Sequence, residues 1–395
     1  MDYENNYNDA EKVELTEESA EVGASPEADG TTAGTEKSSE QVVYFDPEIS
    51  YSASPTYNFE VDNARAAKAC STRLHLSLFV YLIISQGIGS IIAALSMLFV
   101  PIDSLVEGYS SFSIVLNIVA QYVIAFPVFF LLTRNMRKRA DVKKRRLGAD
   151  EFFILILISE AAMLLGALIS NLIGSFFGYI FGNTPENSID ALVSGGDLVL
   201  TALMVCVFAP IFEELMFRKL FIDRMSVFGD RVAIILSALG FGFFHGNIYQ
   251  IIYATAVGLI FGYVYTSTRK IHYTIILHSI LNFLGGVLPM LLAPLEQDIY
   301  IADEFFSANG YYPDEGAYVI NNVILSAFSI FEILLMLGGI AAFIVVLVKK
   351  KIKIQNEKEI WVSGKELRRA TVLNVGFIAA YALCLGLTIL TLFVV

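Results

Sequence analysis

The chain has 395 residues, of which 55% are hydrophobic and only 17% charged, and its mean hydropathy is +0.62. These values lie outside the usual range of soluble globular proteins. They exclude an ordinary soluble enzyme or binding module. We therefore expect an all-α, multi-pass protein of the cell membrane, a transmembrane helix bundle whose surroundings are the lipid bilayer. We expect no nucleic-acid partner.

The negative charge is concentrated at the N-terminus. Residues 1–62 contain sixteen Asp or Glu against Lys12 and Lys37, so this segment has a net charge of −14. Because the whole chain has a net charge of −12, the remaining residues together carry +2. An acidic segment rich in Ser, Thr, Gly and Ala cannot bury enough apolar surface to fold alone. We predict that residues 1–70 form a disordered acidic tail on the cytoplasmic side.

Long apolar segments predict the membrane spans. A helix needs about 20 apolar residues to cross a bilayer core of about 30 Å. The sequence suggests nine such segments, at residues 74–100, 111–133, 152–182, 197–226, 231–247, 250–268, 271–293, 318–348 and 371–395.

The loops between these spans differ in charge. Lys and Arg collect before the first span, after the second, and between spans four and five, six and seven, and eight and nine. The opposite loops carry acidic residues, among them Asp103, Glu186, Glu296, Asp298 and Asp303, and contain no Lys or Arg. An excess of Lys and Arg marks the cytoplasmic face. We therefore expect the N-terminus inside and the C-terminus outside.

Ionisable residues interrupt the fourth apolar segment, in the run from Phe212 to Arg218. Ionised groups are costly in hydrocarbon and are kept there mainly for function. Glu214 and Arg218 are four residues apart, which places them on one helical face within ion-pair reach. Glu213 lies about 100° away around the helix. We therefore expect Glu214 to be paired and Glu213 to be available for proton transfer.

Two downstream segments carry further polar groups, namely His245, and His278 with Asn282. At about 1.5 Å of rise per residue from the basic loops, Glu213 lies roughly 16 Å deep, and the other three lie roughly 21, 12 and 18 Å deep. All four fall in one layer around the middle of the membrane. A single buried histidine is more often structural, but the four groups together predict a functional site.

The patterns EExxxR, FxxxH and HxxxN in these segments resemble the three motifs of the CAAX prenyl protease and bacteriocin-processing family, the glutamic intramembrane endopeptidases of the ABI type. The resemblance covers roughly residues 197–293. It implies that Glu213 and His245 bind and activate a water molecule, and that His278 and Asn282 stabilise the oxyanion of the reaction.

Glu214 and Arg218 match the second Glu and the Arg of the first motif, for which the resemblance implies a positioning role. The implied enzyme is a metal-independent endopeptidase without a cofactor, acting on a peptide or membrane-protein substrate inside or near the cytoplasmic half of the membrane. On this basis we divide the membrane part into N-terminal helices (71–196), a catalytic core (197–293) and C-terminal helices (294–395).

Two other functions fit the same polar residues. In a zinc metallopeptidase, Glu213, His245 and His278 would ligate Zn²⁺, a ligand set found in catalytic zinc sites. In a non-enzymatic bacteriocin-immunity or transport protein, the buried polar groups would bind an ion, a proton or a peptide. Inverted repeats would favour transport, and the sequence shows none.

Two patterns are better explained by packing than by chemistry. Ala254, Gly258 and Gly262 recur every four positions, a spacing that lets helix backbones approach closely. The three cysteines, Cys70, Cys206 and Cys384, show no pairing pattern, so the sequence predicts no disulfide framework.

Overall fold

The computed structural model describes residues 59–96, 111–112, 114–140, 144–182, 197–354 and 356–393. Every regular element in these ranges is a helix, as the sequence predicts. Helix α1 spans Phe59–Ser96, so residues 59–70 are helical although we expected them in the tail. The alanines at 66, 67 and 69 favour a helix, whereas hydropathy marks only the part of a helix that enters the bilayer. Residues 1–58, the rest of the expected tail, lie outside the described ranges.

Seven helical stretches in the described residues are long and apolar enough to cross a membrane, or eight if one bent pair is a single span. The bent pair consists of α14 (Gly364–Val372) and α15 (Val375–Phe393), which meet at 55°. The seven are Val61–Ile91, Ile114–Thr133, Ala149–Phe181, Leu198–Phe228, Ile248–Thr268, Ile271–Asn309 and Glu315–Val348.

The predicted fifth span, residues 231–247, is not among these stretches. It corresponds to α9, which spans Asp230–Phe244 and has 15 residues. Such a helix rises only about 22 Å, less than the thickness of the hydrocarbon core. The described residues therefore contain seven or eight candidate spans, fewer than the nine that the sequence suggested.

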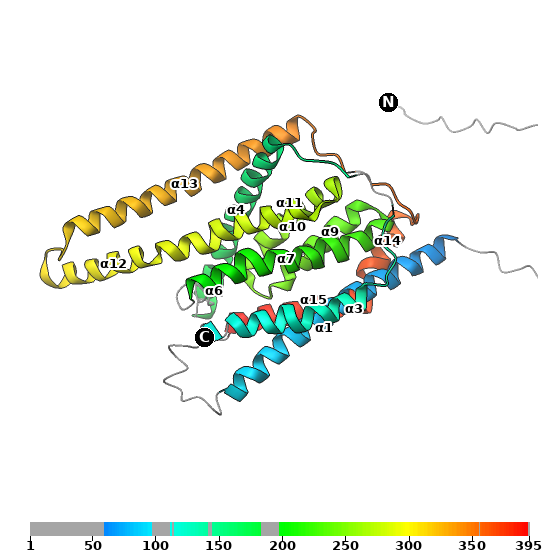
Figure 1. The fold of residues 1–395 in the computed structure, drawn as a ribbon, viewed down its shortest axis with the longest axis horizontal. Helices are drawn as coiled ribbons and strands as arrows, with labels where there is room; N and C mark the ends of the chain where they lie inside the picture. Colours follow the sequence, from blue (N-terminus) through cyan, green and yellow to red (C-terminus); the bar gives the residue numbers. More distant parts are fainter. Residues whose placement is uncertain are drawn as a thin grey trace, which may run out of the picture. The chain divides into compact units, whose positions relative to one another are not determined.

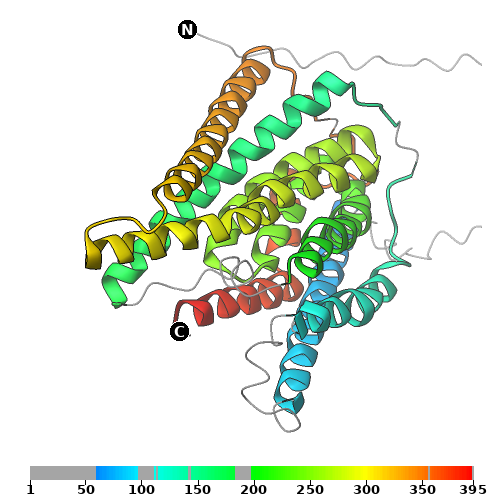
Figure 2. The same ribbon diagram turned by 60° about the vertical axis from the view of Figure 1, so that its left-hand side comes forward.

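The remaining elements follow the chain from the second span onward (Figures 1 and 2). The second and third spans contain η1 (Val119–Ala125), α3 (Phe126–Thr133) and α4 (Ala149–Phe181). The fourth contains α6 (Leu198–Leu203), η2 (Met204–Phe208), α7 (Ala209–Glu214), η3 (Leu215–Ile222), α8 (Asp223–Met225) and η4 (Ser226–Phe228). After α9 come α10 (Ile248–Thr268), α11 (Ile271–Asn282), η5 (Phe283–Val287), α12 (Leu288–Asn309) and α13 (Glu315–Val348). The segments η1, η2, η3 and η5 are π-helical.

The seventh span runs further than the sequence suggested. The helix continues through α12 to Asn309, so Glu296, Asp298 and Asp303 lie in a helix and not in a loop. The chain turns only at Gly310, whose φ of 78° suits a residue without a side chain, and α13 then runs beside α12 (Figure 1). Acidic residues mark where a helix leaves the apolar layer, but they do not end it.

Helices α9 and α10 pack closely, as the small residues on α10 predict. A Cβ atom added to Gly258 would lie 3.1 Å from the Cα atom of Ala238, and one added to Gly262 would lie 3.0 Å from a methyl group of Ile234. The prediction of a packing role for these glycines is therefore confirmed. The three cysteines are free in the structure.

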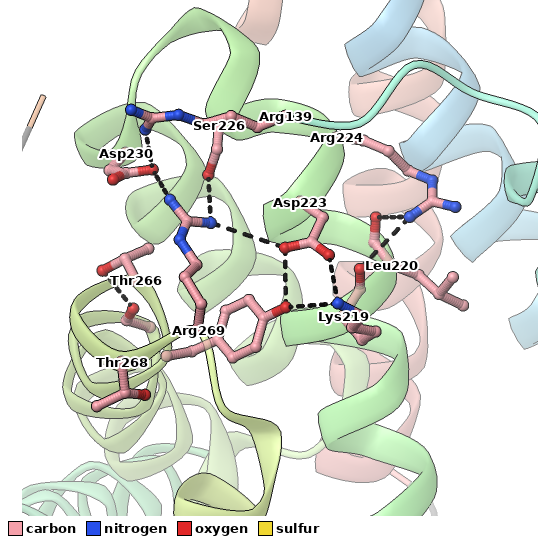
Figure 3. Close-up of polar contacts among 12 residues, drawn as sticks. Arg139, Lys219, Leu220, Asp223, Arg224, Ser226, Asp230, Thr266, Thr268 and Arg269 are labelled. Carbon is pink, nitrogen blue, oxygen red and sulfur yellow. Dashed lines mark hydrogen bonds and ion pairs between the residues drawn. The ribbon is translucent and has the colours of Figure 1, made fainter. Parts of the chain in front are cut away.

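An ionic network joins the ends of several helices that the sequence assigned to the basic face (Figure 3). Asp230, at the start of α9, lies 3.1 Å from a guanidinium nitrogen of Arg139 and 2.6 Å from one of Arg269. Asp223 lies 2.9 Å from the ammonium of Lys219 and 3.7 Å from the guanidinium of Arg269. The basic loops after α3 and α10 and the loop before α9 therefore meet at one end of the bundle.

The loop after α13 reaches the same end. Glu359 lies 3.3 Å from Arg137, and Glu357 lies 3.4 Å from Arg139. The basic segments thus share one side of the helices. That this side is cytoplasmic remains a prediction from the charge pattern.

Candidate active site

The fourth span changes its helical winding where the acidic residues lie. Pro210, near the start of α7, lacks an N–H group and crowds the preceding turn. The five residues before α7 form the π-helical segment η2, and a second π segment, η3, begins directly after Glu214. Segments of this kind are frequent at functional sites because they rotate side chains out of the regular α-helical order. Here they flank Glu213 and Glu214.

Arg218 and Glu214 form the expected ion pair. The Nε atom of Arg218 lies 3.1 Å from a carboxylate oxygen of Glu214, and both side chains are completely buried. The guanidinium carbon also lies 4.5 Å from the ring centre of Phe241 and 5.2 Å from that of Phe261. Aromatic faces attract a cation, the more so in a desolvated site. The pair and the two rings together hold the buried charge.

His278 links the two glutamates. Its Nδ1 atom is 3.1 Å from Oε1 of Glu214, and its Nε2 atom is 3.8 Å from Oε2 of Glu213. An ionised carboxylate only accepts hydrogen bonds, so the Nδ1–H group donates to Glu214 and Nε2 faces Glu213. The side chain of Glu213 is largely buried, and its Oε2 atom has no hydrogen-bond partner. Glu213 is thus the carboxylate outside the ion pair with Arg218, as the sequence predicts.

His245 follows the last residue of α9. Its Nδ1 atom lies 2.8 Å from the carbonyl oxygen of Phe241, one turn earlier. Because a carbonyl oxygen accepts and does not donate, Nδ1 carries the hydrogen. In the neutral ring, Nε2 is then the hydrogen-bond acceptor. The ring of Phe241 contacts both His245 and His278, with centres 5.2 and 5.6 Å apart. One aromatic side chain therefore supports both imidazoles.

Asn282 lies at the end of α11. Its Nδ2 atom donates a hydrogen bond of 2.7 Å to the carbonyl oxygen of Val205 in η2. In a π-helix the N–H groups bond five residues back, which disturbs the regular ladder of carbonyl partners. This bond ties α11 to the fourth span and leaves the second N–H of the amide for another acceptor.

A cavity of about 380 Å³ collects the predicted catalytic residues. Glu213, His245, His278 and Asn282 all line it. Glu214 and Arg218 are not among the described residues that line the cavity, so this ion pair lies behind the cavity wall. The structure therefore brings the four groups together and separates them from the ion pair. Their catalytic roles remain a prediction.

Residues outside the three motifs also line the cavity and were not predicted. They include Gln86 of α1, Asn117 and Gln121 of the second span, and Gln250 of α10. Asn117 and Gln121 are one turn apart, and their carboxamides lie 3.4 Å from each other. Polar side chains within an apolar span are unusual. The spacing of four between these two carboxamides, within the apolar segment 111–133, was the sequence signal from which this side of the cavity could have been predicted.

The zinc alternative requires Glu213, His245 and His278 as ligands. In the part of the chain that the structure describes, no group of three or more His, Cys, Asp or Glu side chains is arranged to hold a metal ion. The Nδ1 atom of His278 is engaged with Glu214, and that of His245 with a backbone carbonyl.

Comparisons with known proteins agree with the motifs. Residues 195–284 match the family model described as type II CAAX prenyl endopeptidase Rce1-like. A protein of Bacillus subtilis (strain 168), named as the candidate membrane peptidase YdiL, is 25% identical over 170 residues, which make up 42% of this chain and 67% of that protein. No solved structure gives a significant match. The matched segment contains all six predicted site residues.

Proposed function

We propose that this chain, whose residues 195–284 match the type II CAAX prenyl endopeptidase Rce1-like family model, is a membrane protease of that family. In this proposal it hydrolyses a peptide bond inside the membrane with a water molecule activated by Glu213. The substrate is a peptide or a membrane protein. The observation that carries this proposal is the difference between the two adjacent glutamates. Glu214 is held by Arg218 and His278, whereas Glu213 lines the cavity with an oxygen atom that has no hydrogen-bond partner.

In the proposed reaction, water lies between Glu213 and Nε2 of His245. Glu213 takes a proton from the water, and the resulting hydroxide attacks the carbonyl carbon of the substrate. A positioned general base of this kind contributes typically about 10²–10⁴-fold to the rate. When the C–N bond of the tetrahedral intermediate breaks, Glu213 returns the proton to the leaving amine. The products are a carboxylic acid and an amine, and Glu213 is ionised again.

His278 and Asn282 face the oxyanion in this proposal. Glu214 accepts the Nδ1 hydrogen of His278 and fixes the orientation of the ring, and in this proposal Nε2 donates a hydrogen bond to the oxyanion. The second N–H of Asn282 supplies another donor. Hydrogen-bond donors aimed at developing negative charge are worth several kcal/mol in a site with little bulk water.

The test is a comparison of membrane proteomes from cells that express the wild type or Glu213→Gln at equal abundance. New peptide termini present only with the wild type would identify substrates and support the proposal. Identical sets of termini, together with undiminished cleavage of an identified substrate by purified Glu213→Gln, would contradict it.

A further inference from the structure

The residues that line the cavity do not lie at one depth. On the fourth span they run from Glu213 to Thr201, which are 11 and 23 residues from Arg224 at the basic end. At about 1.5 Å per residue, this corresponds to depths of about 16 and 35 Å. Asn117 lies about 26 Å from Arg134, and Gln250 about 28 Å from Arg269, on the same scale. The cavity therefore extends from the catalytic layer toward the helix ends opposite the basic loops.

On the basic side, large side chains fill the space next to the catalytic layer. Phe217, Arg218 and Phe221 of the fourth span are at most 1% exposed, as are Phe261 and Tyr265 of α10. Beyond them, the ionic network around Asp223 and Asp230 ties the loops together (Figure 3). The cavity is thus backed by packed rings and paired charges toward the face that the sequence identifies as cytoplasmic.

The short helix α9 shapes the opposite side. It ends at Phe244, and the chain turns through Gly246 and Asn247 before α10 begins at Ile248. After Phe244 and His245, the next residue along the chain that lines the cavity is Gln250 of α10. Non-helical backbone at this depth is tolerated where it is buried in protein or lines a water-filled cavity. This turn is itself buried in protein, with Asn247 only 3% exposed, and it lies next to the cavity that His245 lines.

Four carboxamides lie along this part of the cavity, on three different spans. Gln86 and Asn117 are exposed, and Gln121 and Gln250 are partly buried. A carboxamide carries both donors and an acceptor, and can therefore pair with the N–H and C=O groups of an extended peptide. Gln121 bonds to Asn117, and Gln250 to Tyr253. One such bond uses only part of the donors and acceptors of a carboxamide, and the remainder would be costly to expose to hydrocarbon. Water or a polypeptide therefore suits this surface better than lipid.

From these observations we propose that the cavity is a hydrated vestibule open toward the extracytoplasmic side. An extended, uncharged peptide segment exposed on that side lies along Gln86, Asn117, Gln121 and Gln250, and its scissile bond reaches Glu213 near the middle of the membrane. The proposal rests on the proposed function for the reaction at Glu213 and on the charge pattern for the orientation. It defines the substrate class as peptides presented from outside, not from the cytoplasm.

Access is tested by cysteine labelling. In a variant with the three native cysteines replaced by Ala, Gln121→Cys places a thiol in the vestibule. Lys138→Cys places one in the basic loop that follows the same span, as a matched control. A membrane-impermeant maleimide is added either to spheroplasts or to inverted vesicles. We expect Gln121→Cys to be labelled in spheroplasts, and Lys138→Cys to be labelled only in inverted vesicles.

The proposal is overturned if Gln121→Cys is not labelled in spheroplasts, or if Lys138→Cys is labelled there. Size-exclusion chromatography in detergent establishes that each cysteine variant is folded before labelling is scored. Labelling does not require turnover, so the same labelling is repeated in proteins that also carry Glu213→Gln. If the pattern is unchanged in these proteins, it reports access to the vestibule independently of catalysis. A failure of the vestibule is then distinguishable from a failure of the proposed function.

A kinetic arm tests the peptide contact. Replacing Gln121 with Leu removes a donor and an acceptor at nearly constant volume, and we expect a rise in KM that exceeds the change in kcat. Asn322→Leu on α13, a carboxamide outside the cavity lining, serves as the control and should change neither constant. An unchanged KM for Gln121→Leu would contradict the carboxamide contact.

Discussion

Glu214 accepts a hydrogen bond of 3.1 Å from the imidazole of His278, and this contact joins residues that are 64 positions apart in the chain. The same carboxylate is 3.1 Å from Arg218 on its own helix. The second glutamate of the first motif is therefore an anchor between two spans. By holding Nδ1 of His278, it directs Nε2 toward Glu213, 3.8 Å away.

The first prediction concerns Glu213. Replacement with Gln keeps the size of the side chain and removes its ability to accept a proton from water. We expect a loss of turnover of at least about 10²-fold, because this is the usual contribution of a general base. Cleavage is measured with purified protein in liposomes. Glu160→Gln, at a buried acid of α4 outside the cavity lining, is the control and should retain full activity.

The second prediction concerns Arg218, whose loss should damage the fold. Arg218→Ala leaves Glu214 buried without its cation, and removal of one partner from a buried ion pair typically costs about 3–5 kcal/mol. We expect lower abundance and a lower midpoint of thermal unfolding in detergent. Glu213→Gln should show neither effect. A normal midpoint for Arg218→Ala would refute the structural role of the ion pair.

The third prediction separates the two hydrolytic mechanisms. A catalytic zinc ion lowers the pKa of its bound water, so its removal stops the reaction and its return restores it. In the proposed mechanism Glu213 and His245 act on water without an ion. We therefore expect substoichiometric zinc by elemental analysis and continued cleavage after prolonged treatment with 1,10-phenanthroline. One zinc per chain, with activity that follows its removal and return, would support the metallopeptidase instead.

The fourth prediction concerns the contact between α9 and α10. A Cβ atom at Gly242 would overlap the hydroxyl of Thr255 and lie 2.8 Å from the carbonyl oxygen of Ile251. Gly242→Ala should force the helices apart and destabilise the protein by about 1–3 kcal/mol, the usual cost of overpacking. Since His245 follows one turn later, activity should fall too.

The control for this substitution is Gly386→Ala on α15, where an added Cβ meets no atom within 4 Å. Alanine favours a helix more than glycine does, so this variant should be as stable as the wild type or more so. Equal unfolding midpoints for Gly242→Ala and Gly386→Ala would show that the close approach at Gly242 is unimportant.

The sequence predicted the helical class and the Glu214–Arg218 pair because both depend on local periodicity. Apolar length identifies a membrane helix, and a spacing of four places two side chains on one face. The depth of each motif, measured from the basic loops, also sufficed to place Glu213, His245, His278 and Asn282 around one cavity.

Other features depend on contacts that no local pattern records. Residues 232–244 are almost entirely apolar, and hydropathy alone did not reveal that this helix, Asp230–Phe244, is too short to cross the membrane. The bond between His278 and Glu214 depends on how two spans rotate against each other. The fourth span also contains the π-helical segments η2 and η3, which lack a simple sequence signature.

The turn after α9 has a consequence for the size of the working unit. Gly246 has a φ of 58°, and a Cβ atom there would lie 3.2 Å from the Cβ of Leu387 in α15. The last helix of the chain therefore covers the backbone next to His245, although it lies more than 90 residues beyond the family match at 195–284. A fragment trimmed to the matched segment would lose this cover and expose polar backbone. We therefore expect that the part of the chain needed for a stable site extends beyond the matched segment and includes α15.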